Sequence, residues 1–268
     1  MTAFPGTLWL LFGLAMVVSA MGFYKYVYFI SLGYGFSIAA LGLLMGALFR
    51  DALSVGTMAA CLLLVAYGCR LGGFLLVREV KSAAYRSAMK REIKDGTGMK
   101  FGVKCAIWVT CAALYALQVL PVFYRLSNGG GTDSWCVAGV CVMALGVVLE
   151  SAADLQKSAA KKKNPDRFCD TGLFRLVRCP NYLGELIFWT GVLLCGVGAL
   201  SGVGQWLLAL LGYGGIVYVM FSGARRLEVR QNRNYGADPE YRAYVARVPI
   251  LLPFLPLYSV EKYKFLVA

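Results

Sequence analysis

The stretch Glu150–Glu185, ESAADLQKSAAKKKNPDRFCDTGLFRLVRCPNYLGE, decides how this chain folds. It leaves one apolar segment with two acids, Glu150 and Asp154, crosses a basic loop, and enters the next apolar segment with a third acid, Glu185. Ionisable residues inside a bilayer are costly and usually mark function. We therefore expect a polar site where these two segments meet.

The composition is typical of a membrane protein. Of the 268 residues, 59% are hydrophobic and 15% are charged, whereas soluble domains are about half apolar. The net charge of +13 must therefore be concentrated in loops. Basic loops beside apolar segments usually set the orientation in the bilayer and attract anionic lipid. We expect membrane lipids as partners and no nucleic acid.

The absence of histidine excludes several chemistries. No histidine occurs in the chain, which rules out Ser-His-Asp triads and histidine-ligated metals, and we expect no metal. Nine cysteines are present without a CxxC pair, mostly in apolar segments where they act as small hydrophobes. Cys169 and Cys179 lie in the basic loop, which is expected to face a reducing cytoplasm. No disulfide is therefore predicted.

Seven apolar segments reach the length of about 20 residues that a helix needs to cross a bilayer. They cover residues 6–23, 27–49, 52–77, 101–124, 134–155, 182–200 and 202–222. The sequence therefore predicts an all-α polytopic membrane protein with about seven transmembrane helices. We expect residues 1–50 to form an N-terminal transmembrane hairpin and residues 51–268 to form the domain that holds the site. No basic residue precedes Lys25, so the first segment is predicted to be a span and not a cleaved signal peptide.

Lysine and arginine predict the orientation of the spans. One side carries Lys25, eight basic residues between Arg78 and Lys104, seven between Lys157 and Arg178, and eight in the tail after residue 222, and the other carries Arg50 and Arg125. The more basic side faces the cytoplasm, so the N-terminus is predicted outside and the C-terminus inside. The membrane is expected to be a bacterial inner membrane or one like the endoplasmic reticulum. The tail is predicted to lie at the interface, anchored by Tyr241, Tyr244, Phe254, Tyr258 and Tyr263.

Helical spacing groups the polar residues of the spans. Glu150 and Asp154 are four residues apart and share one helical face, as do Tyr67 and Arg70, which are three apart. With Glu185, they predict a polar pocket between the third, fifth and sixth spans, open to the cytoplasm. The alternative is an ion pair between Arg70 and Glu150 or Asp154 that only holds helices together.

The basic loop also has two interpretations. Its seven cations either enforce topology alone or bind a phosphorylated ligand. Pro180 suits the first turn of the sixth span, which places Asn181 and Tyr182 where helix N-terminal amides favour an anion. Basic residues around such a helix end suit a pyrophosphate.

The same stretch closely resembles the C-terminal domain of the steroid 5-alpha-reductase family, in particular its functionally uncharacterised bacterial branch. The resemblance covers about residues 67–256 and is strong over residues 150–189. It rests on E-x3-D-x-Q-K, on G-L-F-R-x-x-R-x-P-N-Y-x-G-E, and on a later S-G-x-x-x-x-E with a terminal Y-x-x-Y. The matching residues are Glu150, Asp154, Gln156, Lys157, Gly172, Leu173, Arg175, Arg178, Pro180, Asn181, Tyr182, Gly184, Glu185, Ser222, Gly223, Glu228, Asp238, Pro239, Tyr241 and Tyr244.

The resemblance implies a seven-helix bundle that binds NADPH from the cytoplasm and transfers hydride to the C=C bond of a hydrophobic enone, such as a lipid or steroid-like molecule. Tyr67 matches the tyrosine that hydrogen-bonds the substrate carbonyl, where a donor stabilises developing negative charge. The residues that match the family's cofactor contacts are Arg70, Glu150, Asp154, Lys161, Arg178, Asn181, Tyr182 and Glu228.

Two positions depart from the family's pattern, and two other functions stay open. Cys179 stands where the family has the histidine of R-H-P-N-Y, and the second span has no acid where the steroid reductases have a glutamate. Isoprenylcysteine carboxyl methyltransferases and phospholipid methyltransferases are similar in their last spans and bind S-adenosylmethionine, although Glu228 is followed by Val229 and not by their second glutamate. The remaining alternative is a non-catalytic membrane protein that binds lipid or a partner.

Overall fold

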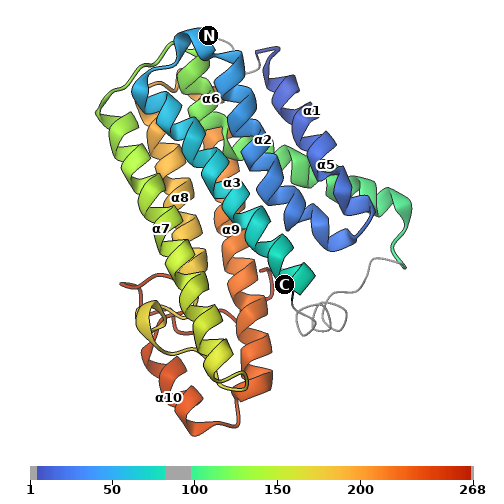
Figure 1. Ribbon diagram of the computed structural model, residues 1–268, viewed down its shortest axis with the longest axis vertical. Coiled ribbons are helices and arrows are strands. Elements are labelled where there is room, and N and C mark those ends of the chain that lie inside the picture. Colours follow the sequence, from blue (N-terminus) through green and yellow to red (C-terminus); the bar gives the residue numbers. More distant parts are fainter. Residues whose placement is uncertain (1–4, 82–97, 267–268) are drawn as a thin grey trace. The chain divides into compact units, whose positions relative to one another are not determined.

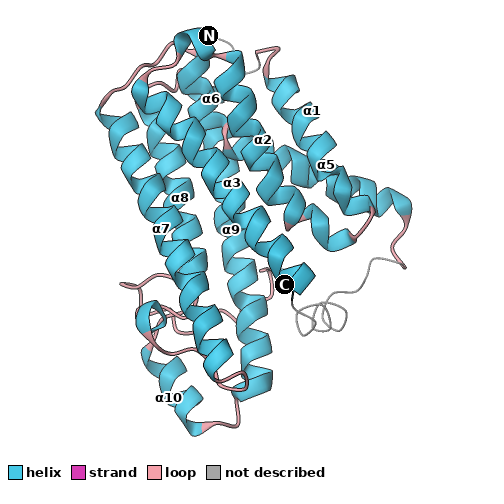
Figure 2. Ribbon diagram, in the orientation of Figure 1, coloured by secondary structure: helices cyan, strands magenta, loops and turns pink. Residues whose placement is uncertain are grey.

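The computed structural model describes residues 5–81 and 98–266. Within these ranges the chain forms helices and connecting loops without a strand (Figure 2). The α-helices are α1 (Leu8–Ser19), α2 (Leu32–Leu48), α3 (Val55–Lys81), α5 (Phe101–Gln118), α6 (Leu120–Ser127), α7 (Ser134–Lys163), α8 (Pro180–Val197), α9 (Gly202–Tyr235) and α10 (Pro239–Arg247), joined in places by short 3-10 turns. The prediction of an all-α fold is confirmed.

Five helical segments of the described chain are long and apolar enough to cross a membrane, which makes this a polytopic membrane protein. They are Tyr26–Leu48, Val55–Lys81, Phe101–Gln118, Ser134–Lys163 and Gly202–Tyr235. The other two predicted spans correspond to a shorter apolar helix, Leu8–Phe23, and to α8, which carries Asn181 and Glu185 in its first two turns. The orientation stays a prediction. Much of the basic stretch between Arg78 and Lys104 lies outside the described residues.

The helices differ from the predicted apolar segments at three places. The fourth span was expected to run unbroken over residues 101–124, but α5 ends at Gln118 and α6 begins at Leu120, with Pro121 in its first turn. Proline lacks an amide hydrogen and clashes with the preceding turn, so it ends a helix or begins a new one. α7 and α9 run beyond the predicted ends at residues 155 and 222, to Lys163 and Tyr235. Their polar extensions are rich in Ala, Lys, Arg and Gln, which favour helix outside a bilayer too.

The described chain forms two compact units. Of the described residues, one unit contains 5–81, 98–140 and 192–213, and the other contains 141–191 and 214–266. In the first unit α2 and α3 lie side by side (Figure 1) and touch through glycines. A Cβ added to Gly35 would lie 2.7 Å from the amide nitrogen of Gly72, and one added to Gly68 would lie 2.4 Å from the carbonyl oxygen of Gly35. Small residues allow this close backbone approach, which is common between membrane helices. The predicted boundary after residue 50 stays a prediction.

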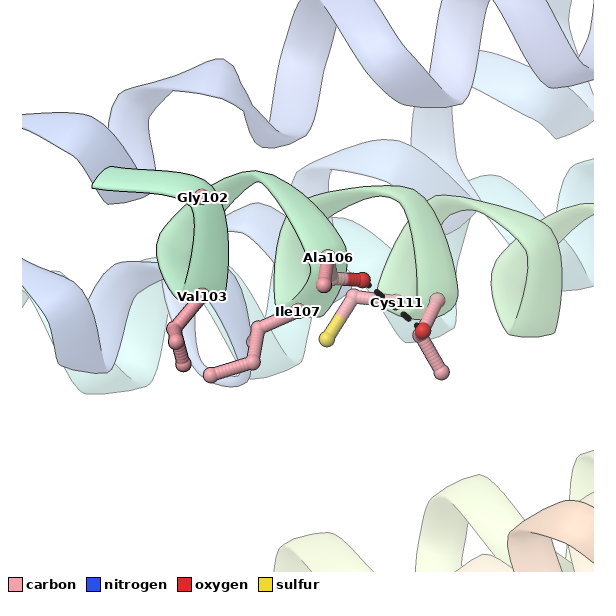
Figure 3. Close-up of a pocket in the computed structure, with 6 residues that line it drawn as sticks. Gly102, Val103, Ala106, Ile107 and Cys111 are labelled. Atoms are coloured by element: carbon pink, nitrogen blue, oxygen red, sulfur yellow. Dashed lines mark hydrogen bonds between the residues drawn. The ribbon is translucent and has the colours of Figure 1, made fainter. Parts of the chain in front are cut away.

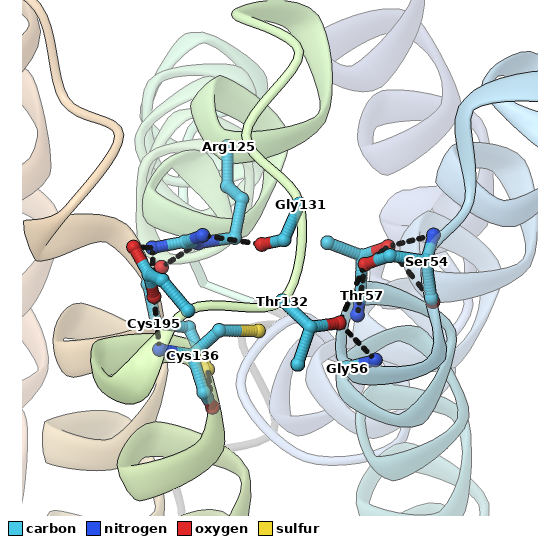
Figure 4. Close-up of polar contacts among 9 residues, drawn as sticks. Ser54, Gly56, Thr57, Arg125, Gly131, Thr132, Cys136 and Cys195 are labelled. Atoms are coloured by element: carbon cyan, nitrogen blue, oxygen red, sulfur yellow. Dashed lines mark hydrogen bonds and ion pairs between the residues drawn. The ribbon is translucent and has the colours of Figure 1, made fainter.

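A buried arginine organises one end of the first unit. Arg125 is 1% exposed and binds both carboxylate oxygens of Asp133 at 2.9 Å, the carbonyl of Gly131 at 2.6 Å and the carbonyl of Cys195. Beside it, the hydroxyl of Thr132 accepts from the amide of Gly56 at 2.8 Å (Figure 4). This network fixes the loop between α6 and α7, so Arg125 has a structural role and is not simply a charge at the membrane surface.

The second unit combines parts of α7, α8 and α9 with the basic loop and α10. Its polar end has a small aromatic core of Phe168, Tyr241, Tyr244 and Val248. The hydroxyl of Tyr241 donates to Asn232 at 2.8 Å, and that of Tyr244 donates to the carbonyl of Phe174 at 2.7 Å. The prediction that Tyr241 and Tyr244 anchor the tail at the interface is therefore wrong. Both rings pack against Phe168, and the internal partner of each hydroxyl removes the cost of burying it.

Candidate functional site

The centre of the candidate site is a buried ion pair between Arg178 and Glu228. Arg178 ends the basic loop immediately before α8, and Glu228 lies on α9. Nη2 of Arg178 is 2.8 Å from Oε1 of Glu228, and the two side chains are 0% and 1% exposed. Each partner also holds the C-terminal tail, which from here on means the segment that follows α10. Nη2 of Arg178 donates to the carbonyl of Tyr258, and Oε2 of Glu228 accepts from the amide of Val260 at 2.8 Å. The pair therefore joins loop, helix and tail.

Several polar atoms near this pair are buried and make no hydrogen bond with any described residue. They are Nε and Nη1 of Arg178, Oδ1 of Asn181 and Oγ of Ser222. Leaving a buried donor or acceptor unpaired costs about 1–3 kcal/mol, and more for a charged group. A polar ligand or bound water is the usual partner of such atoms. These atoms therefore favour a site that recognises a polar or anionic group.

Two close helix contacts place the neighbouring residues. A Cβ added to Gly184 on α8 would lie 2.7 Å from the amide nitrogen of Glu150 on α7. A Cβ added to Gly223 on α9 would lie 3.3 Å from the ring of Tyr182. Glu150 is 3% exposed and lies at the crossing of α7 and α8, beside Gly184, which follows Asn181 on α8 by three residues. Asp154 is half-buried one turn further along α7.

Cys179 is a buried, neutral thiol. It is 1% exposed, and its amide donates to the carbonyl of Ile250 at 3.0 Å. Burial raises the pKa of Cys179 to about 11, against the positive charges of Lys157 and Arg178, which lower it. The thiol is therefore protonated at neutral pH and does not act there as the base or acid that a histidine provides.

Lys161 holds the basic loop in place. Its ammonium donates to the carbonyls of Pro165 at 2.8 Å and Arg167 at 2.7 Å, and to the hydroxyl of Tyr235 at 2.7 Å. An ammonium has three donors, so these bonds use all of them. Binding of a phosphate by Lys161 stays a prediction, and it would require exchange of one of these bonds.

Tyr67 and Arg70 lie on α3 in the first unit. Tyr67 is fully buried, and its hydroxyl is 2.9 Å from that of Tyr34 on α2. Nε2 of Gln118 donates to Tyr34 at 3.5 Å. Arg70 is half-buried, with its guanidinium 5.9 Å from the ring of Phe74. Tyr67 therefore belongs to a buried polar cluster of the first unit. Arg70 also lies in the first unit, and the remaining candidate residues, from Glu150 to Glu228, belong to the second unit.

Sequence reasoning missed Tyr34, Gln118 and the tail. A tyrosine or glutamine inside an apolar span is a visible signal, because a buried hydroxyl or amide needs a partner. Tyr258 and Val260 contribute main-chain atoms to the Arg178–Glu228 pair, and no side-chain pattern indicates such contacts.

The helices and the buried ion pair define the class of this protein: a polytopic helical membrane protein with a buried polar cluster in its C-terminal half. Residues 17–248 match the family described as "Protein of unknown function (DUF1295)", and the chain belongs to this family. No curated protein and no solved structure matches the chain significantly.

Proposed function

We propose that this protein is an NADPH-dependent membrane reductase that transfers hydride to the C=C bond of a lipid or steroid-like enone. The observation that carries the proposal is the buried guanidinium of Arg178, which has two nitrogens without a partner among the described residues. Arg178 belongs to the stretch that resembles the cofactor-binding region of the steroid 5-alpha-reductases.

The residues of the second unit fit the phosphates of a dinucleotide. The unpaired N–H groups of Arg178 have the fixed geometry that suits phosphate oxygens. Pro180, Asn181 and Tyr182 form the first turn of α8, where exposed amides favour an anion. Lys157 adds positive charge near Cys179. Glu228 positions Arg178 through the 2.8 Å ion pair and does not itself need to touch the cofactor.

Asn181 and Ser222 supply the uncharged contacts. Oδ1 of Asn181 accepts hydrogen bonds, and Oγ of Ser222 both donates and accepts. These atoms suit the hydroxyl or amide groups of the cofactor. Glu150 and Asp154 have carboxylates suited to accept from ribose hydroxyls, and Arg70 and Lys161 complete the set that the resemblance implies.

The chemistry needs a donor at the substrate carbonyl. NADPH supplies the hydride when it is bound. Hydride addition to an enone builds negative charge on the carbonyl oxygen, and a phenol in a dry site stabilises that charge. Tyr67 has this role in the proposal. Its bond to Tyr34 fixes the orientation of its hydroxyl, so Tyr34 is a positioning residue.

The test is cofactor binding by the full-length protein purified in detergent. We expect NADPH to bind, as measured by its fluorescence and by a rise in melting temperature. Asn181→Ala and Ser222→Ala should each weaken binding by about 2- to 12-fold, the loss of one hydrogen bond of about 0.5–1.5 kcal/mol. Oδ1 of Asn181 and Oγ of Ser222 make no hydrogen bond with the described residues, so the fold should survive their removal.

Ser37→Ala is the matched control. Oγ of Ser37 is also buried without a hydrogen-bond partner among the described residues, but it lies on α2 in the first unit. NADPH affinity should be unchanged in this variant.

If S-adenosylmethionine alone stabilises the protein, the methyltransferase alternative replaces the reductase. A response to neither ligand would favour the non-catalytic lipid-binding alternative.

A further inference from the structure

A second candidate binding site lies on α9, in a groove between this helix and the C-terminal tail. The groove has a volume of about 390 Å³, within the range of ligand pockets, about 300–1,000 Å³. Its walls are almost entirely apolar. The lining residues are Gly214, Val217, Tyr218 and Phe221 of α9 and Leu257, Val260, Tyr263, Phe265 and Leu266 of the tail.

The α9 wall is one continuous helical stripe. Gly214, Val217, Tyr218 and Phe221 are spaced by three and four residues, so they share one face of the helix. A Cβ added to Gly214 would meet nothing within 4 Å, so the groove is open at this point. Four residues beyond Phe221, the same face carries Arg225. The apolar stripe therefore ends at a cation.

The tail wall is held by hydrogen bonds from side chains of α9 to main-chain carbonyls of the tail. The hydroxyl of Tyr218 donates to the carbonyl of Phe265 at 2.9 Å. Arg225 donates to the carbonyls of Glu261 at 3.0 Å and Leu266 at 3.1 Å. These bonds form the second wall before any ligand arrives, and such preorganisation lowers the entropic cost of binding.

The charges at the polar end of the groove favour an anion. Arg225 uses two of its five N–H groups in the bonds to the tail, which leaves donors on a guanidinium that is already fixed in place. Arg226 follows Arg225 on α9, and Lys262 and Lys264 follow Glu261, whose carbonyl accepts from Arg225. All three cations are exposed. The carboxylate of Glu261 is turned to Asn232, which donates to it at 2.7 Å and lies two turns beyond Arg225 on α9.

We propose that this groove binds an anionic phospholipid, with one acyl chain between α9 and the tail and the phosphate at Arg225. An apolar groove with a cationic end fits an amphiphile of this charge, whereas the cation of a zwitterionic headgroup would lie among arginine and lysine side chains. In the predicted orientation Arg225 lies on the cytoplasmic side, where polybasic segments attract anionic lipids.

A groove of similar size on α5 provides the comparison. It has a volume of about 370 Å³ and is lined by Gly102, Val103, Ala106, Ile107, Thr110 and Cys111 of this single helix. Val103 and Ile107 point to the same side of α5 (Figure 3). No second segment forms an opposite wall among its lining residues, so headgroup selectivity is not expected there.

The experiment compares the melting temperature of the full-length protein in nanodiscs of phosphatidylcholine alone and of phosphatidylcholine with phosphatidylglycerol. We expect phosphatidylglycerol to raise the melting temperature of the wild type. Val217→Trp fills the groove and leaves the bonds of Arg225 intact, so it should abolish this rise. Ile107→Trp, the matched change on α5, should keep it. The test does not depend on NADPH binding or on turnover.

A second variant keeps the test decisive if Val217→Trp does not fold. Gly214→Leu fills the same groove from a position where a Cβ meets no neighbour, and it should also abolish the rise. Native mass spectrometry should then find phosphatidylglycerol bound to the wild type and to Ile107→Trp, and lost from the groove-filling variants. Equal melting temperatures in the two lipid mixtures, or a rise that persists in both groove-filling variants, would overturn the proposal.

Discussion

Glu228 divides its two carboxylate oxygens between Arg178 and the tail. Oε1 is 2.8 Å from Nη2 of Arg178, and Oε2 is 2.8 Å from the amide nitrogen of Val260. Desolvation makes a buried ion pair costly unless further hydrogen bonds satisfy both partners. Both carboxylate oxygens of Glu228 accept a hydrogen bond, whereas only Nη2 of the Arg178 guanidinium donates one to the described residues. This asymmetry favours Arg178 as the ligand-binding partner and Glu228 as its support.

Glu228→Gln should strongly destabilise the protein. The change leaves a buried guanidinium without its counter-charge. Breaking a buried pair in this way lowers the free energy of unfolding by about 3–5 kcal/mol. Glu240→Gln is the control, because Glu240 pairs with Arg167 at the surface and its side chain is 67% exposed. Surface pairs contribute about 0–1 kcal/mol. Melting curves of both variants test this prediction, and equal shifts would show that the Arg178–Glu228 pair adds little stability.

Tyr67→Phe should lower the rate of enone reduction and leave NADPH affinity unchanged. Removing a donor that stabilises an oxyanion typically lowers kcat by about 10²–10³. Tyr34→Phe should have a smaller effect, because Tyr34 acts through its 2.9 Å bond to Tyr67. The measurement is NADPH oxidation with a hydrophobic enone, alongside a binding titration. A Tyr67→Phe variant with the wild-type rate would remove Tyr67 from its assigned role.

Gly184→Ala should destabilise the crossing of α7 and α8. The new Cβ would lie 2.7 Å from the amide nitrogen of Glu150, and overpacking of this kind costs about 1–3 kcal/mol. Because Glu150 must move, NADPH affinity should also fall. At Gly73 on α3 a Cβ meets nothing within 4 Å, so Gly73→Ala should raise stability by about 0.5–1 kcal/mol through helix propensity. Equal melting temperatures for the two variants would contradict the close contact.

Cys179 should resist alkylation in the folded protein. Its pKa of about 11 leaves almost no thiolate at pH 8. Because this pKa lies above the unfolded value of 9.0, the neutral thiol favours the folded state below pH 9, and that contribution is lost as the pH rises towards 11. Mass spectrometry after maleimide treatment should find Cys179 modified only after denaturation. Modification in the native state at pH 8 would show that the loop before α8 opens.

The sequence located the membrane helices better than it located their ends. Hydropathy reports where a helix leaves the bilayer, whereas hydrogen bonding decides where the helix stops. α7 therefore continues through Lys161 to Lys163, and α9 continues to Tyr235. Pro121 was visible in the sequence, but an apolar run hides a break that only the backbone of α5 and α6 reveals.

The sequence could name single residues of the candidate site, but it could not predict how they are arranged in space. Resemblance singled out Arg178 and Glu228 separately, but their pairing across 50 positions depends on how α9 is rotated. The hydroxyl of Tyr34 is a polar group in an apolar span, and hydropathy does not tell which neighbour it faces. The same limit explains why Tyr241 and Tyr244 were expected at the interface and lie in an aromatic core.

The tail holds the site almost entirely through its main chain. Pro249 and Ile250 accept from the amides of Arg178 and Cys179, and Tyr258 and Val260 bind Arg178 and Glu228, in each case through a backbone atom. Backbone atoms are the same whatever the side chain, so this segment is free to diverge in sequence as long as its path is kept. The family match ends at residue 248, immediately before these contacts begin. Relatives whose C-terminal sequences look unrelated are therefore expected to close the site in the same way.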